Sequence, residues 1–131
     1  MSTAVTMTTA GLNLIRDGLR GVATDIKIYY VAVGTDSTAP SASDTTLGAE
    51  VFRKVMTSTA NGVSDGEATF TLALSPQDAV GEVIAEVGWF AGADASVTAD
   101  TGVLMARVLY SHTKLASESI NLVFNDSLTA S

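Results

Sequence analysis

Apolar and polar residues alternate along several short stretches of the chain, the pattern of a β-strand with one covered face. The clearest stretch is Glu67 to Leu74, in which every second residue from Ala68 onward is apolar. Turn-forming pairs such as Asn61-Gly62 separate such stretches. The pattern predicts six strands, at residues 25–33, 53–59, 67–74, 83–90, 103–110 and 119–124.

A different period, of three and four residues, marks the segment from Thr9 to Arg20 as a helix. Thr8 or Thr9 can cap its start, and Gly21 can end it. The apolar face of this helix is formed by four residues: Leu12, Ile15, Leu19 and Val22. We expect this face to pack on the protein's own sheet, with docking on another subunit through Leu12 and Leu19 as the alternative.

These elements predict a mostly-β fold, either an antiparallel β-sandwich or a partly open barrel, with one N-terminal α-helix. A single helical turn is also expected within residues 44–51, carrying Leu47 and Val51. Residues 9–126 are predicted to form one domain, residues 1–8 an N-terminal arm and residues 127–131 a frayed tail. A chain of 131 residues is long enough for one hydrophobic core. The N-terminus does not resemble a secretory signal.

Charged residues make up 16% of the chain, against roughly 25% in ordinary soluble proteins. Proteins built of strands usually protect their sheet edges with lysine and other charges, and this chain has three lysines. We therefore expect other subunits to cover much of its surface, most simply further copies of itself. The alternative is a monomer whose sheet edges are blunted by loops.

The net charge of −7 opposes binding to nucleic acid and to anionic membranes, so neither is an expected partner. Cysteine is absent, which excludes disulfides and thiolate metal sites. The single histidine, His112, is expected to be an exposed loop residue, not a catalytic one. Asp94 and Asp100 flank a loop, but their spacing matches no calcium-binding loop. We expect no enzymatic activity, no cofactor and no metal.

Glu86 stands between apolar neighbours in the middle of a predicted strand. Arg53 or Arg107 can pair with it, and a buried ion pair of this kind is more often structural than catalytic. Trp89 and Phe90 are consecutive strand residues, so their side chains point to opposite faces. Either one of them anchors an interface with another subunit, or both faces of the strand are covered within the protein.

Three segments that follow one another along the chain look similar to a known family when taken together. They are residues 30–34 (YVAVG) with the loop that follows, residues 44–53 (DTTLGAEVFR), and residues 84–90 (IAEVGWF) followed by residues 102–106 (GVLMA). Together they resemble the N-terminal domain of bacteriophage tail-fibre and tail-collar-type proteins, over roughly residues 10 to 125. Two departures stand out: the sequence stops where such fibres continue into a shaft, and Trp89 replaces the usual leucine.

This resemblance implies a structural protein of the virion, in the tail, baseplate or fibre-attachment region, made in the host cytoplasm. Such proteins are often trimeric and bind other virion proteins. Glu50, Arg53 and Glu86 match the recurring charged positions of the family, and we expect them to pair inside the subunit or across its interface. Two alternatives are a capsid or tail-tube decoration protein and a carbohydrate-binding β-sandwich module.

Overall fold

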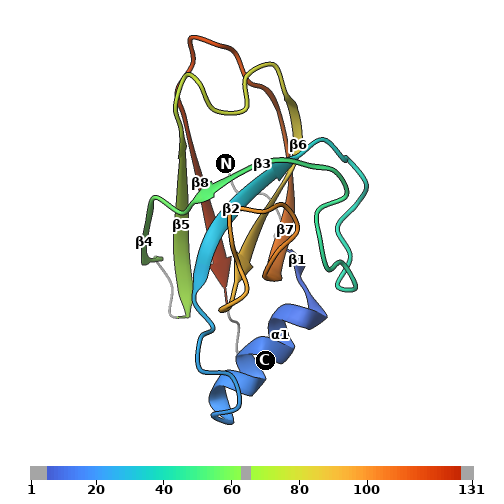
Figure 1. Cartoon of the computed structure of the whole chain (residues 1–131), viewed down its shortest axis with the longest axis vertical. Helices are drawn as coiled ribbons and strands as arrows, with labels where there is room; N and C mark the ends of the chain where they lie inside the picture. The colour runs from blue at the N-terminus through green and yellow to red at the C-terminus, as the bar shows by residue number, and fades with distance from the viewer. Residues whose placement is uncertain (1–5, 63–65, 128–131) are drawn as a thin grey trace.

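The computed structural model describes residues 6–62 and 66–127 and shows one helix and eight strands in this part of the chain (Figure 1). Residues 1–5 of the predicted arm and residues 128–131 of the predicted tail lie outside the described residues. The elements are β1 (Thr6–Met7), α1 (Thr9–Leu19), β2 (Ile28–Gly34), β3 (Glu50–Val55), β4 (Ser58–Asn61), β5 (Glu67–Leu74), β6 (Val83–Ala91), β7 (Val103–Thr113) and β8 (Ile120–Ser127).

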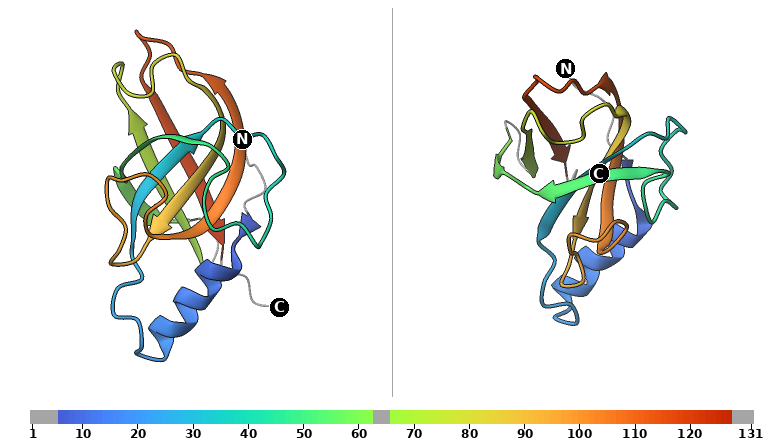
Figure 2. Two further views of the ribbon diagram at one scale, coloured as in Figure 1. Left: turned by 45° about the vertical axis from the view of Figure 1, so that its right-hand side comes forward. Right: turned by 45° about the horizontal axis from the view of Figure 1, so that its top comes forward.

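The strands form two antiparallel sheets, which confirms the predicted mostly-β fold with one N-terminal helix. The larger sheet has the order β1-β7-β6-β2-β3, and the smaller has the order β4-β5-β8. The chain passes from the larger sheet to the smaller one between β3 and β4. Of the two residues at this point, the first is hydrogen-bonded to the larger sheet and the second to the smaller sheet. Met56 N–H donates to Tyr29 O at 2.9 Å, and Thr57 N–H donates to Thr71 O at 2.9 Å. The sheets therefore make an open sandwich and not a closed barrel (Figure 2).

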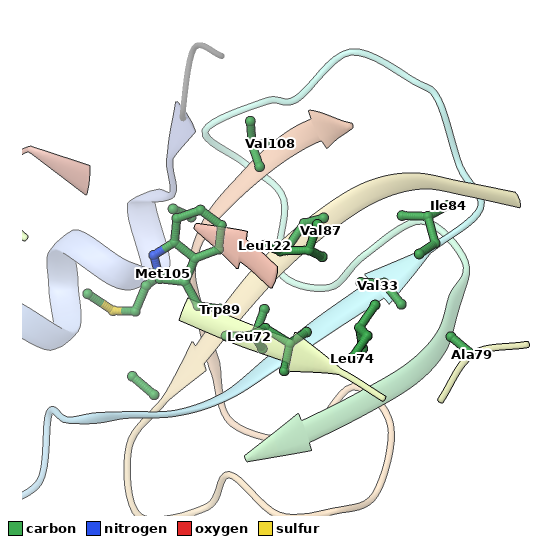
Figure 3. Close-up of a cluster of buried hydrophobic side chains, with 13 residues drawn as sticks. Val33, Leu72, Leu74, Ala79, Ile84, Val87, Trp89, Met105, Val108 and Leu122 are labelled. Atoms are coloured by element: carbon green, nitrogen blue, oxygen red, sulfur yellow. The ribbon is translucent and has the colours of Figure 1, made fainter. Parts of the chain in front are cut away.

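The main core fills the space between the two sheets. Trp89 and Val87 of β6 face Leu72 of β5 and Leu122 of β8, and all four are at most 3% exposed (Figure 3). The Phe70 ring lies 6.2 Å from the Trp89 ring, in a tilted arrangement. The apolar side chains at alternate positions of these strands thus pack face to face, and their apolar surface is removed from water.

The outer face of the larger sheet is also covered, by the long loops at residues 35–49 and 92–102. Leu47 from the first loop packs on Ala32, Phe90 and Leu104. Each of these four residues is at most 3% exposed. The second half of β2 and most of β6 are consequently buried on both faces, although their sheet is antiparallel.

Helix α1 begins as predicted but packs through a different face. Thr8 caps it by accepting a hydrogen bond from Gly11 N–H at 2.8 Å. Gly11 lies so close to β7 that a Cβ there would be 2.9 Å from Met105 Cα, and Gly18 approaches Ile26 in the same way. Small residues therefore decide which side of the helix faces the sheet, together with two partly buried neighbours, Leu14 and Ile15.

The predicted apolar face of α1 is in consequence mostly exposed, which corrects the expectation that it packs on the sheet. Leu12 is 51% exposed, Leu19 84% and Val22 64%. Of the four predicted residues, Ile15 alone packs against the core. No helix in the described residues is long and apolar enough to cross a membrane.

Two further predictions of local structure were wrong. The helical turn expected at residues 44–51 is irregular up to Ala49 and then becomes strand β3. The single strand expected at residues 53–59 is two strands, because the chain changes sheets at Met56 and Thr57. Strand β5, by contrast, has the predicted bounds.

Leu122 and Val123, neighbours on β8, point to opposite sides of the smaller sheet and are 3% and 55% exposed. We expect Leu122→Ala to lower the free energy of unfolding by about 2–5 kcal/mol, because it leaves a cavity between the sheets. Val123→Ala should lower it by less than about 1 kcal/mol, the range of strand propensity. Chemical denaturation of both variants measures this difference. Equal losses would contradict the packing of β8 on the larger sheet.

Candidate functional site

The carboxylate of Glu86 is a fully buried charge in the middle of the larger sheet. Glu86 lies in the middle of β6 and is 0% exposed. Its Oε1 accepts from Arg107 Nε at 2.8 Å and from Gly48 N–H at 2.8 Å. Its Oε2 accepts from Ala49 N–H at 2.8 Å and from Asp36 N–H at 3.1 Å. Four charge-assisted hydrogen bonds thus replace the water that this carboxylate loses on burial.

Arg107, on the adjacent strand β7, extends this network toward the same loop. Its side chain is 3% exposed. Besides Glu86 it reaches the Asp36 carbonyl oxygen at 3.3 Å and Asp44 Oδ2 at 3.4 Å. Of the two partners considered for Glu86, the structure brings Arg107 to it and places Arg53 elsewhere. The ion pair therefore fastens residues 36–49 to the sheet.

The position before this loop has to be glycine. A Cβ at Gly34 would overlap the carboxylate of Glu86 and would lie 2.6 Å from the Ala49 carbonyl oxygen. Gly34 is also where the pairing of β2 with β3 shifts register. The missing side chain lets the loop close over the carboxylate.

Arg53 forms a second network with Glu50, its neighbour on β3. Arg53 Nε and Nη2 donate to the two carboxylate oxygens of Glu50 at 2.7 and 2.8 Å, and both side chains are 2% exposed. Arg53 Nη1 donates to the carbonyl oxygens of Ser96 and Thr101, each at 3.0 Å. Its guanidinium lies 4.3 Å from the centre of the Phe90 ring. The Arg53–Glu50 pair therefore holds the loop at residues 92–102 to the sheet, as the Arg107–Glu86 pair holds residues 36–49.

Trp89 and Phe90 are both 0% exposed, on opposite faces of β6. Trp89 lies between the sheets, and Phe90 lies under Arg53 and Leu47. Of the two alternatives, the structure has the one in which both faces are covered within the subunit. The expectation that one of these rings anchors an interface is therefore wrong, since neither ring reaches the surface of the subunit.

The remaining polar candidates, His112, Asp94 and Asp100, lie apart from the two networks. His112 lies in β7 and not in a loop, and its Nε2 is 3.0 Å from both carboxylate oxygens of Glu118. Hydrogen bonds from His112 and from the Leu115 amide lower the pKa of Glu118. In residues 6–62 and 66–127, no three histidine, aspartate or glutamate side chains come together as a metal site. Asp94 and Asp100 are both exposed loop residues.

A hollow of about 440 Å³ lies between the C-terminal end of α1 and the loop after β6. Its walls include Leu14, Val22, Ala91 and Val103, and its charged lining residues are Asp25 and Asp94. A binding site for a small molecule usually combines an apolar wall with several convergent polar groups. This hollow has the apolar wall, but its two carboxylates are not accompanied by a cluster of convergent polar groups.

The charged groups of the two networks bind the protein's own backbone, and the surface exposes several large aliphatic side chains among its polar residues. The exposed aliphatic residues include Leu12 and Leu19, the two helix residues that the sequence proposed for an interface. Sequence reasoning missed the backbone N–H groups that surround Glu86, because amides carry no signature in a sequence. Gly34 and Gly48, on either side of the loop, were the available signal.

Comparisons with protein-family models, with curated proteins and with solved structures find no match to this chain. The function must therefore be argued from the residues themselves.

We expect Glu86→Ala to lower the free energy of unfolding by about 3–5 kcal/mol, because it leaves the buried Nε of Arg107 and three backbone amides without the carboxylate that they bind. Asp94→Ala, at an exposed loop position, is the control and should change stability by less than about 0.5 kcal/mol. Denaturant titration with tryptophan fluorescence measures both. A loss below about 0.5 kcal/mol for Glu86→Ala would place this carboxylate in water.

The hydroxyl and the backbone amide of Thr38 donate to Asp36 Oδ1 at 2.7 and 2.9 Å. These bonds, with a further contribution from Arg107, hold the pKa of Asp36 below its ordinary value of 3.8. A carboxylate with a lowered folded-state pKa stabilises the fold above pH 3.8, and this contribution is lost as the pH falls through the lowered value.

Thr38→Val removes the hydroxyl bond to Asp36. We therefore expect the variant to unfold at a lower temperature than the parent at pH 7, and the gap to close as the pH falls below 3.8. Thermal unfolding followed by circular dichroism across this range tests the prediction. A gap that stays constant down to the lowest pH would show that Thr38 does not act through the ionised Asp36.

Proposed function

We propose that this chain is a structural protein of a bacteriophage particle, in the tail, baseplate or fibre-attachment region, and that it acts by binding copies of itself and other virion proteins. The ordered resemblance of residues 30–34, 44–53, 84–90 and 102–106 to tail-fibre and tail-collar-type proteins supports the class. In this proposal the protein has no catalytic role. The fibre shaft and its receptor-binding activity are not carried over.

The observation that carries the proposal is the contrast between the interior and the surface. Arg53, Arg107 and Lys114 are buried, with side chains or whole residues at most 3% exposed. Leu19 and Val97, by contrast, are 84% and 77% exposed. An enzyme keeps some charged or nucleophilic groups available in a cleft, whereas a protein of an assembly keeps aliphatic area available on its surface.

Assembly also fits the free strand edges. Strand β8 is the border of the smaller sheet along eight residues, and its pairing with β5 runs without a bulge. It contains no lysine and no proline, the two residues that most often protect such an edge. A covering neighbour would protect it instead.

The carbohydrate-binding alternative is less well supported. It requires aromatic rings exposed together on one face. Among the rings whose burial is described, Trp89 and Phe90 are fully buried and the other five are partly buried. The decoration-protein alternative shares the same surface properties and differs in its position on the particle.

The purified chain should sediment as a species well above 13.4 kDa, because its exposed aliphatic residues favour association. Analytical ultracentrifugation over a range of concentrations measures this. A compact monomer that stays soluble at high concentration would count against self-assembly.

Antibodies against the chain should label particles of the phage that encodes it, at the tail or baseplate, in negative-stain electron microscopy. Label on the head or along the tail tube would favour the decoration-protein alternative. Complete absence of the chain from purified particles, checked by mass spectrometry, would refute a virion role altogether.

A further inference from the structure

The two ends of the molecule's longest axis carry exposed aliphatic residues of different electrostatic character. Helix α1 ends at the bottom of the molecule, and the loops after β5 and β7 lie at its top (Figure 1). The same arrangement is seen after a turn of 45° (Figure 2, left). We call these ends the helix pole, residues 16–22, and the loop pole, residues 75–83 and 114–118.

The helix pole combines aliphatic side chains with cations. Leu19 is 84% exposed and Val22 is 64% exposed. The side chains of Arg16 and Arg20 are 58% and 65% exposed, and both lie within 4.0 Å of the single carboxylate of Asp17. Within residues 16–22 two guanidinium groups therefore share one counter-charge, which leaves a local surplus of one positive charge, while the carboxylates of Asp25 and Asp94 border the hollow beside Val22.

The loop pole combines aliphatic side chains with anions. Val80, Val83 and Leu115 are 46%, 57% and 59% exposed. The carboxylates here are those of Asp78, Glu82 and Glu118. The cation of this pole, Lys114, is 0% exposed, and Lys54 from β3 is paired with Asp78 at 2.7 Å. The accessible charge of the loop pole is therefore negative.

The loop pole is ordered before any partner arrives. Gly81 N–H donates to the Lys114 carbonyl oxygen at 2.9 Å, and Lys114 N–H donates to Glu82 O at 3.0 Å. The Lys114 ammonium lies inside, donating to the carbonyl oxygens of Pro76 and Leu115 at 3.4 and 3.0 Å. One buried lysine thus joins the two loops into a single surface, which lowers the entropy cost of binding.

The helix pole is ordered as well. Gly21 adopts a positive φ of 75°, and Val22 and Ala23 N–H both donate to the Asp17 carbonyl oxygen, at 2.9 and 3.0 Å. This closes the end of the helix and fixes the backbone of Val22 against its last turn. Both poles are therefore preformed surfaces.

We propose that the helix pole of one copy binds the loop pole of a second copy, head to tail. Contact between two helix poles would bring guanidinium groups together, and contact between two loop poles would bring carboxylates together. Only the contact between unlike poles brings aliphatic residues together with opposite charges. The inference rests on the proposed function, because it specifies how copies of the chain associate.

A contact between different surfaces leaves one free pole at each end of every pair. Assembly therefore continues until the copies close into a ring or form an extended stack. A mixing experiment tests this property directly. Leu19→Asp blocks the helix pole and Leu115→Asp blocks the loop pole, and both positions are exposed enough for the fold to tolerate the change.

In sedimentation at a concentration where the parent is associated, each variant alone should be a monomer, with association weakened at least tenfold. An equimolar mixture should form a one-to-one dimer, because the intact helix pole of one variant meets the intact loop pole of the other. Circular dichroism and thermal unfolding show whether both variants are folded. Val123→Asp, on β8 and away from both poles, is the control and should assemble like the parent.

Other results would overturn the inference. If both pole variants assemble like the parent, association uses another surface, and dissociation of Val123→Asp alone would identify the free edge of β8. If Leu19→Asp dissociates while Leu115→Asp remains a dimer, the helix poles pair symmetrically. These outcomes leave the proposed function intact. Absence of the chain from virions would refute that function and would not depend on the poles.

A charge exchange provides a second test that does not alter the aliphatic residues. Arg20→Glu and Glu82→Arg should each weaken association several-fold, since each places like charges at the contact. Combining both substitutions in one chain should restore part of the association, because the side chains at positions 20 and 82 are again opposite in charge. Equal weakening in the single and double variants would contradict a contact between these two poles.

Discussion

A buried carboxylate is stable only if hydrogen bonds replace its lost hydration, and much of this structure follows from meeting that requirement at Glu86. Its oxygens accept from Arg107 and from three backbone amides of the loop at residues 36–49. The loop must close onto the sheet to supply those amides. Its closure brings Leu47 over Phe90, so the polar network and the second apolar cluster form together.

Burial of basic side chains leaves the surface with fewer cations than the composition of the chain suggests. The chain has seven basic residues, and the structure uses three of them, Arg53, Arg107 and Lys114, to hold loops from inside. Fewer cations are left for the exterior than the sequence count suggests. The charged fraction of 16% therefore overstates how many cations the exterior carries.

The sequence was sufficient for the elements set by alternation and capping, and insufficient where distant contacts decide. Strand β5 and the start of α1 were predictable because side-chain period and a threonine cap are local properties. The packed face of α1 was not, since it depends on how closely Gly11 can approach Met105. Nor could the sequence choose between Arg53 and Arg107 for Glu86, because strand order determines which guanidinium is adjacent.

Strands β6 and β7 run side by side between the two ends of the molecule and pair from Val83–Thr113 to Ala91–Val103. Their hydrogen bonds are perpendicular to this direction. Tension applied along the long axis would therefore load all these bonds in shear at once, instead of opening them one after another. A mechanical pull between the two ends would meet the stiffest direction of the fold.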